Sequence, residues 1–181
     1  MAPEALPANA DARDAEAARL SLKLEAVFGK IQQERMLDVP ILNPALSVSA
    51  IGMRPFGETW VCAVITPWFI NVMMLPGRAE DVEAWSRVPV GTKAEQEFPA
   101  GTFEFLCSTE DELGPFRMCS LFSPVLEFAN QEAALAAAEA ALGALFDENL
   151  DQTSEPEAAP KKEAAQLSRR TLFLCRKTAR P

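Results

Sequence analysis

Two consecutive apolar runs, residues 58–66 (ETWVCAVIT) and 69–75 (FINVMML), constrain the fold of this chain more than any other feature. Both are rich in β-branched and aromatic residues, and neither alternates apolar with polar positions, which predicts strands that are covered on both faces. Pro67 lacks the N–H that a strand interior needs, and Pro76-Gly77 is a turn dipeptide. The pattern therefore predicts a central antiparallel hairpin that bends at Thr66-Pro67-Trp68 and ends in a turn.

Two helices are predicted on either side of this region in the sequence. The first is expected over residues 15–37, where large apolar side chains recur at helical spacing. The second is expected over residues 131–146, where Asn130 is placed as the N-cap and Glu132 lies in the first turn. The first stripe consists of Leu20, Leu24, Val27, Phe28 and Ile31, and the second of Leu135, Leu142, Leu145 and Phe146.

Further strands complete the predicted sheet. Residues 102–109 and 116–122 flank an acidic turn and predict a second antiparallel hairpin. Single strands are expected over residues 46–53 and 171–176, and the polar segment 78–91 has room for a short helix. The fold class is therefore α+β, an antiparallel sheet packed with an N-terminal helix and with a helix in the C-terminal half.

Composition divides the chain into a domain and flanking segments. Residues 1–15 are rich in Ala and Pro and predict a disordered extension, which leaves 16–150 as the α+β domain. Residues 151–168 are expected to be a flexible linker, since 151–165 carry no aliphatic side chain larger than Ala. Residues 169–176 are expected to return to the sheet as a final strand, and 177–181 form a basic tail.

The charge and the missing histidines limit the possible chemistry. The chain has no histidine, which excludes Ser-His-Asp and Cys-His nucleophilic sites and His-ligated zinc. Its net charge of −9 combines a body of −14 up to residue 165 with +5 over residues 166–181. An acidic body disfavours nucleic acid and favours a basic protein segment as partner. No targeting segment or run of about 20 apolar residues is evident, so stable membrane insertion is not expected.

The cysteines and carboxylates do not form a recognisable catalytic or metal site. The four cysteines are far apart in sequence, lack a CxxC pair and fall within predicted strands, which indicates core thiols of a reduced, cytoplasmic protein. A metal site assembled from distant thiolates is the alternative. Glu58 and Glu104 are the acids nearest to strands, and both are expected on solvated faces. The cysteines are Cys62, Cys107, Cys119 and Cys175.

Large apolar groups at strand ends and turns are candidates for binding an extended or helical peptide. Trp68 is the strongest of them, because a ring directly after the proline bend is expected to project from the sheet. The alternative is that these residues are core and tight turns. The candidate partner-binding residues are Thr66, Pro67, Trp68, Phe69, Met73, Met74, Pro76, Gly77, Trp85, Ser123 and Pro124.

The run WVCAVITPWFINVMMLPG at residues 60–77 closely resembles the central signature of the HybE/HupJ family of [NiFe]-hydrogenase assembly chaperones. Three further blocks of the resemblance follow in the same order, at residues 98–105 (FPAGTFEF), 119–124 (CSLFSP) and 169–174 (RRTLFL). The resemblance implies a non-enzymatic maturation factor without a cofactor. It would bind a hydrogenase subunit precursor, notably the small subunit with its twin-arginine signal, until cofactor assembly is complete.

The large subunit and a separate rubredoxin-type accessory protein are further partners that the resemblance suggests. Two other classes of function stay open at this point. The first is a redox or metal-carrying factor that uses the cysteines to protect or deliver iron–sulfur clusters in the same pathway. The second is a small ligand-binding enzyme, which the lack of an acid/base constellation makes remote.

Overall fold

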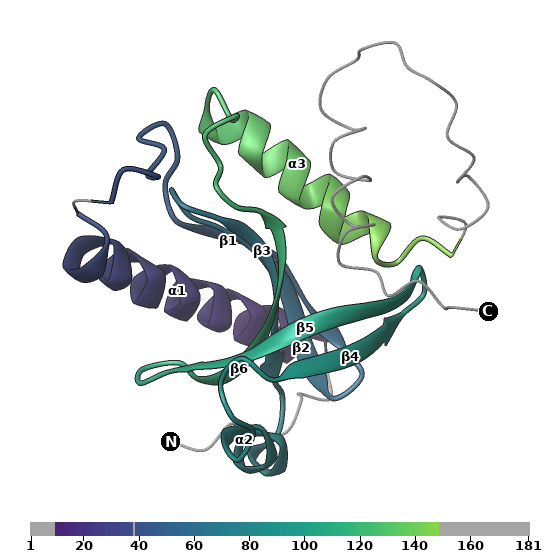
Figure 1. The fold of residues 1–181 in the computed structure, drawn as a ribbon. Coiled ribbons are helices and arrows are strands. Elements are labelled where there is room, and N and C mark those ends of the chain that lie inside the picture. Colours follow the sequence, from purple (N-terminus) through teal and green to yellow (C-terminus); the bar gives the residue numbers. More distant parts are fainter. Residues whose placement is uncertain (1–9, 38, 149–181) are drawn as a thin grey trace, which may run out of the picture.

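The computed structural model describes residues 10–37 and 39–148, which fold as three helices and a six-stranded antiparallel sheet (Figure 1). The elements are α1 (Ala10–Arg35), β1 (Ser49–Phe56), β2 (Thr59–Ile65), β3 (Ile70–Pro76), α2 (Ala79–Ser86), β4 (Lys93–Phe98), β5 (Gly101–Glu110), β6 (Gly114–Phe122) and α3 (Gln131–Ala144). The strand order is β1-β2-β3-β6-β5-β4. This arrangement confirms the predicted α+β class and both predicted hairpins.

The sheet is covered on both faces in its centre, which explains why β2 and β3 are apolar at every position except Thr59 and Asn71. Helices α1 and α3 lie on opposite sides of the sheet (Figure 1). Successive residues of β2 therefore enter different cores. Val61, Ala63 and Ile65 belong to the α3-side core, whereas Trp60, Cys62 and Val64 belong to the α1-side core. The six residues after Thr59 are all buried on one side of the sheet or the other, so none of them needs to be polar.

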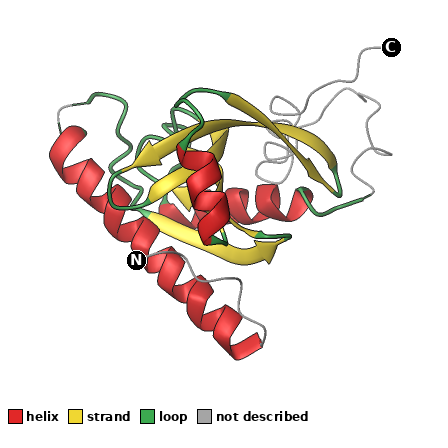
Figure 2. Cartoon of the chain, turned by 90° about the horizontal axis from the view of Figure 1, so that it is seen from below, coloured by secondary structure: helices red, strands yellow, loops and turns green. Residues whose placement is uncertain are grey.

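Helix α2 follows the central hairpin and packs beside β3 and β6. Figure 2 shows it in front of the sheet when the molecule is seen from below. Its Trp85 lies against the edge of the α3-side core. The polar segment 78–91 thus contains the short helix for which the sequence has room. Among the residues that the structure describes, no helix combines the length and the apolar character needed to cross a membrane.

Both long helices differ in detail from their predicted form. Helix α1 begins at Ala10 rather than at residue 15, because its Ala-rich start has high helix propensity and Asp11 lies in the first turn. In α3 the predicted cap is confirmed, since Asn130 Oδ1 accepts a hydrogen bond from the N–H of Ala133 at 2.9 Å. The buried face of α3 consists largely of small residues, namely Ala134, Ala137, Ala138 and Ala141 together with Leu142.

Strand β4 is not among the predicted elements, and β1 is displaced from its predicted position. The sequence of β4, KAEQEF, alternates weakly and has low strand propensity, and its pairing with β5 stabilises it. Strand β1 runs over Ser49–Phe56 rather than 46–53, with a register shift between Ile51 and Arg54. The predicted linker, final strand and basic tail, with Cys175, lie outside the described residues.

Candidate functional site

Three loops meet at the end of the sheet where β2 and β6 finish, and they form the first candidate surface. They are residues 36–37 with 39–48, residues 66–69 and residues 123–130, which together we call the Asn43 loop end. The loops come together because Ile65 and Phe122, the last residues of β2 and β6, both pair with Ile70 at the start of β3. The sheet register therefore places segments close together that are far apart in the sequence.

Asn43 holds these loops together. Its Nδ2 donates to the carbonyl oxygens of Val125, at 2.9 Å, and Phe128, at 2.8 Å. Its Oδ1 accepts the N–H of Ala45 at 3.0 Å, and its own N–H donates to the carbonyl oxygen of Pro67 at 2.7 Å. The side chain is only 5% exposed, so these bonds are shielded from water. Asn43 thus links all three loops, to 123–130 through its side chain and to 66–69 through its backbone N–H.

The Thr66–Phe69 bend is closed by its own threonine. The hydroxyl of Thr66 accepts the N–H of Phe69 at 2.9 Å and of Trp68 at 3.3 Å, and the N–H of Thr66 donates to the carbonyl oxygen of Phe69 at 2.8 Å. This tight turn folds the Trp68 indole back into the α1-side core, where it is 9% exposed. It packs edge-on against Phe69, which packs in turn on Phe28. The expectation that Trp68 projects from the sheet is therefore wrong.

The structure gathers only part of the predicted partner-binding set at this end. Ser123 and Pro124, joined by a cis peptide bond, are exposed on the loop end beside the Thr66–Phe69 bend. Met73 and Met74 are fully buried in mid-strand, on opposite faces of the sheet.

The remaining predicted residues lie elsewhere. Pro76 and Gly77 are at the opposite end of the central hairpin, where Pro76 pairs with Thr59. Trp85 lies on α2, with the Arg117 guanidinium carbon 4.0 Å from the centre of its ring. The predicted residues therefore do not all lie on one surface.

Three exposed apolar side chains were missed from the sequence and lie on the loop end. Leu37 is 74% exposed, Leu126 56% and Ile41 39%. We call them the apolar rim. For Ile41 and Leu126 the available signal was an aliphatic residue in an irregular segment near a proline, outside any periodic apolar pattern, whereas Leu37 ends the predicted helix. The rim gives this end a surface that can take an apolar ligand segment.

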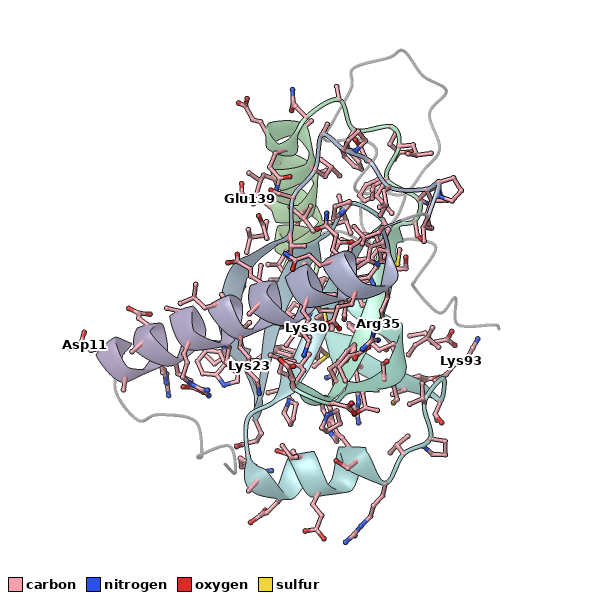
Figure 3. All side chains as sticks on the ribbon, turned by 90° about the vertical axis from the view of Figure 1, so that its left-hand side faces the viewer. Asp11, Lys23, Lys30, Arg35, Lys93 and Glu139 are labelled. Carbon is pink, nitrogen blue, oxygen red and sulfur yellow. The ribbon has the colours of Figure 1, made fainter. Side chains whose placement is uncertain are left out.

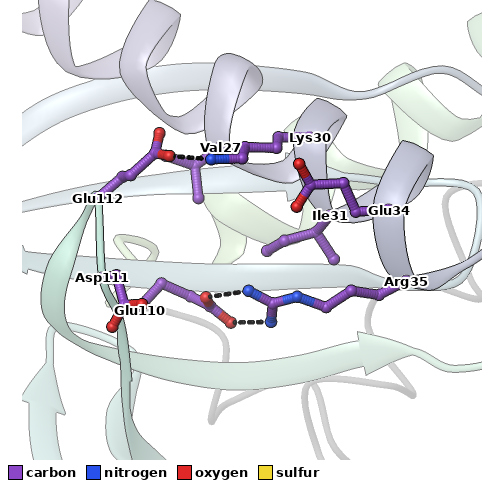
Figure 4. Close-up of a pocket in the computed structure, with 8 residues that line it drawn as sticks. All are labelled: Val27, Lys30, Ile31, Glu34, Arg35, Glu110, Asp111 and Glu112. Carbon is purple, nitrogen blue, oxygen red and sulfur yellow. Dashed lines mark hydrogen bonds and ion pairs between the residues drawn. The ribbon is translucent and has the colours of Figure 1, made fainter.

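A second candidate surface is a pocket of about 160 Å³ between the last turns of α1 and the tip of the β5–β6 hairpin (Figure 4). Its apolar part is formed by Val27 and Ile31, and its polar part by four carboxylates and two cations. Figure 3 shows Lys30 and Arg35 on the second half of α1, near its C-terminal end. The polar lining residues are Lys30, Glu34, Arg35, Glu110, Asp111 and Glu112.

Two ion pairs connect the walls of this pocket. Arg35 donates two hydrogen bonds of 3.0 Å to the carboxylate of Glu110, and Lys30 donates to Glu112. The hydrogen bond from Lys30 lowers the pKa of the Glu112 carboxyl. Both pairs are largely exposed, so they fix the hairpin in place more than they stabilise the fold. The pocket keeps a net negative charge, because Glu34 and Asp111 add to two neutralised pairs.

The described cysteines are core thiols, as predicted. Cys62, Cys107 and Cys119 are all buried and none is in a disulfide. Burial raises the pKa of the Cys62 thiol to about 12, which leaves it protonated at neutral pH. Within residues 10–37 and 39–148, cysteine and carboxylate side chains do not gather in groups of three that could hold a metal ion. Glu58 and Glu104 lie in exposed ion pairs, with Arg78 and Lys93.

Comparison with known proteins identifies the family. Residues 19–175 match the family described as [NiFe]-hydrogenase assembly, chaperone, HybE. The chain belongs to this family. It is 40% identical over 152 residues to the hydrogenase expression/formation protein HupJ of Bradyrhizobium diazoefficiens, and the match covers 84% of each chain.

Other members support the assignment and differ in length. The probable rubredoxin HupJ of Rhodobacter capsulatus is 34% identical over 146 residues, which cover 80% of this chain and 51% of that protein. The solution structure of HybE from Escherichia coli has the same fold, with a TM-score of 0.55 at 21% identity over 80% of this chain and 87% of that one. The hydrogenase-assembly family and the α+β fold inferred from the sequence are thus confirmed.

Proposed function

We propose that this HybE-family chain is a non-enzymatic, cytoplasmic chaperone that binds a [NiFe]-hydrogenase subunit precursor until cofactor assembly is complete. The small subunit with its twin-arginine signal is the proposed main partner. The large subunit and a rubredoxin-type accessory protein are proposed as further partners. The observation that carries the proposal, beside family membership, is an acidic pocket at the last turns of α1, with the exposed Leu37 of the apolar rim two residues beyond Arg35.

This juxtaposition matches the chemistry of a twin-arginine signal, in which a pair of guanidinium groups precedes an apolar stretch. Glu34 and Asp111 supply carboxylates for charge-assisted hydrogen bonds to an arginine. Val27 and Ile31 supply apolar surface for its methylene groups. The acidic body as a whole speeds the encounter with a basic segment, although salt screens this attraction beyond about 8–10 Å.

The apolar stretch of the signal is proposed to cover the rim formed by Leu37, Ile41 and Leu126. Burying one such side chain completely is favourable by about 1.5–3 kcal/mol, and partial burial by less. Of the residues assigned to partner binding from the sequence, Ser123 and Pro124 are exposed beside the rim and stay in the proposal. The buried Trp68, Met73 and Met74 act by shaping the surface from below.

Binding is best tested with variants of exposed residues, because removing Trp68 would disturb the core as well as the surface. Leu37→Ser and Leu126→Ser are expected to weaken binding of the small-subunit precursor by about tenfold each, which corresponds to about 1.4 kcal/mol. Leu22→Ser is the matched control, since Leu22 is similarly exposed but lies in the first half of α1. Affinity is measured by titrating labelled precursor, with circular dichroism to verify folding.

The pocket is tested separately by Glu34→Gln and Asp111→Asn, which remove charge without changing size. Both variants are expected to bind the wild-type precursor more weakly. They should have little effect on the binding of a precursor whose signal arginines are replaced by glutamine. Equal affinities for Leu22→Ser and Leu37→Ser would contradict the role of the rim. Equal losses with both precursors would contradict the role of the pocket.

The redox or metal-carrying alternative is less well supported, because the described thiols are buried in the two cores. The name rubredoxin belongs to a relative of which this chain spans about half the length. Metal analysis of the purified chain separates the two functions: bound iron in stoichiometric amount would favour the carrier.

A further inference from the structure

The outer edge of β4 is suited to pairing with another strand. Within the described residues β4 is the last strand of the sheet, and it pairs with β5 in unbroken register along its whole length. Strand β1 at the opposite edge has a register shift between Ile51 and Arg54 and contains Pro55. Bulges and prolines are features that block edge pairing, so β4 is the better template of the two.

The α3-side core is thin at this edge. Ala94 lies opposite Phe105 and Gln96 lies opposite Phe103, so each large ring has a small or polar neighbour on β4. Paired residues on neighbouring strands share a face of the sheet, and Phe103 and Phe105 belong to the α3-side core. Apolar side chains on an added strand would therefore extend that core.

The other face of the same edge is acidic. Glu95 and Glu104 lie directly opposite each other in the β4–β5 register, an arrangement in which like charges repel. Glu97 is exposed on the same strand, and Lys93 Nζ lies 2.8 Å from Glu104 Oε1. An added strand that carries arginines would be attracted to this face.

The last described residues, after α3, lie beside this edge. The N–H of Ala100, in the β4–β5 turn, donates to the carbonyl oxygen of Leu145 at 3.1 Å, just after α3. The ring of Phe146 packs edge-on against Phe98 at the end of β4, with centroids 5.7 Å apart. Figure 1 shows the end of α3 close to the β4–β5 turn. The last described residues are therefore close to β4, the edge strand of the described sheet.

We propose that residues 169–176 of this chain bind along the outer edge of β4 as a seventh strand. Residues 166–181 contain five basic residues and no acid, which complements the acidic face. The alternate side chains of the segment, Leu172 and Leu174 or Phe173 and Cys175, extend the α3-side core. The family match continues through residue 175, so this segment is part of the unit that the family shares.

Chain length permits this docking in either direction. Residues 149–168 can span up to roughly 60 Å when extended, whereas a six-residue strand is about 20 Å long. The inference concerns the architecture of the domain and does not depend on the identity of the precursor. It excludes the β4 edge as the primary site for a partner strand, because the chain's own segment occupies it.

The test is hydrogen exchange of the full chain, followed by mass spectrometry at low and high protein concentration. We expect amides of residues 171–176 and of β4 to be protected equally at both concentrations. Leu174→Pro removes a donor from the middle of the added strand. It is expected to speed exchange in both segments by at least about tenfold, while β2 and β3 stay protected. Ala164→Pro in the preceding segment is the matched control and should change neither.

Unprotected amides at residues 171–176 in the wild-type chain would overturn the proposal. So would β4 exchange that is unaffected by Leu174→Pro. Protection that grows with protein concentration, together with a dimer that Leu174→Pro dissociates, would assign the β4 edge to a second copy instead. The double variant Arg170→Glu, Arg176→Glu is a second test that does not introduce a proline. Faster amide exchange at β4 would support the proposal, and unchanged exchange would show that the acidic face does not attract the segment.

Discussion

Replacing Asn43 with alanine should cost this protein about 3 kcal/mol of its free energy of unfolding. The substitution removes the two hydrogen bonds that Nδ2 donates to Val125 and Phe128 and the one that Oδ1 accepts from Ala45. Each such bond contributes about 1 kcal/mol net, and a buried group left without a partner costs about 1–3 kcal/mol. Val125 is fully buried, so water cannot easily reach its carbonyl oxygen.

The assay is urea unfolding followed by tryptophan fluorescence, with the free energy extrapolated to water. Asn130→Ala is the matched control. It removes one exposed side-chain hydrogen bond, the α3 cap to Ala133, and should cost about 1 kcal/mol. If the two alanine variants are equally stable, Asn43 does not hold the three loops together in the way that its contacts indicate.

Asn43→Asp tests the direction of the hydrogen bonds. A carboxylate at this position keeps the acceptor for Ala45 but faces two carbonyl oxygens, so the charged form is disfavoured in the folded state. The folded variant then holds its proton more strongly than the unfolded chain does, and its stability falls as pH rises through the ordinary carboxyl range. Relative to wild type, the variant should recover stability on acidification. A deficit independent of pH would show that the side chain does not donate as described.

Two further results are expected. Gly52→Ala should destabilise the fold by at least about 2 kcal/mol, because a Cβ there would lie 2.5 Å from Leu142 Cδ2 at a φ of +64°. Gly29→Ala, in α1 with open space around it, should instead stabilise the fold by about 0.5–1 kcal/mol. Thermal unfolding of both variants measures the difference, and equal melting temperatures would contradict it. Cys62 should resist iodoacetamide at pH 8 in the folded protein and react on unfolding, since its thiol pKa is raised to about 12; rapid native labelling at Cys62, mapped by mass spectrometry, would contradict its burial.

Several features were predictable because local sequence and burial coincide. The β2–β3 hairpin is apolar at nearly every strand position, on both faces of the sheet, and only strands covered on both faces require that. The Asn130 cap follows from a short polar side chain placed directly before an Ala-rich helix. Cysteines within apolar runs are buried for the same reason. In each case the environment of a residue is set by its own element.

The candidate surface was less predictable because it depends on side-chain direction and strand order. Trp68 follows a proline bend, but the hydroxyl of Thr66 closes that bend and directs the indole inward. The pocket is formed by α1 and a hairpin tip about eighty residues away, which meet only because β6 pairs with β3. Strand β4 has a sequence of low strand propensity and exists through its partner β5.

By itself, the sequence determined the fold class, the doubly covered central hairpin and the membership in the hydrogenase-assembly family, since these depend on local periodicity and on ordered motifs. Only the tertiary structure decided which apolar residues are exposed and which loops meet. Leu37 and Leu126 face solvent while Trp68 and Met73 do not, although all four are large and apolar. The reason is that hydrophobicity drives burial without specifying direction, whereas long-range strand pairing and the side-chain and backbone hydrogen bonds of Asn43 fix where each loop lies.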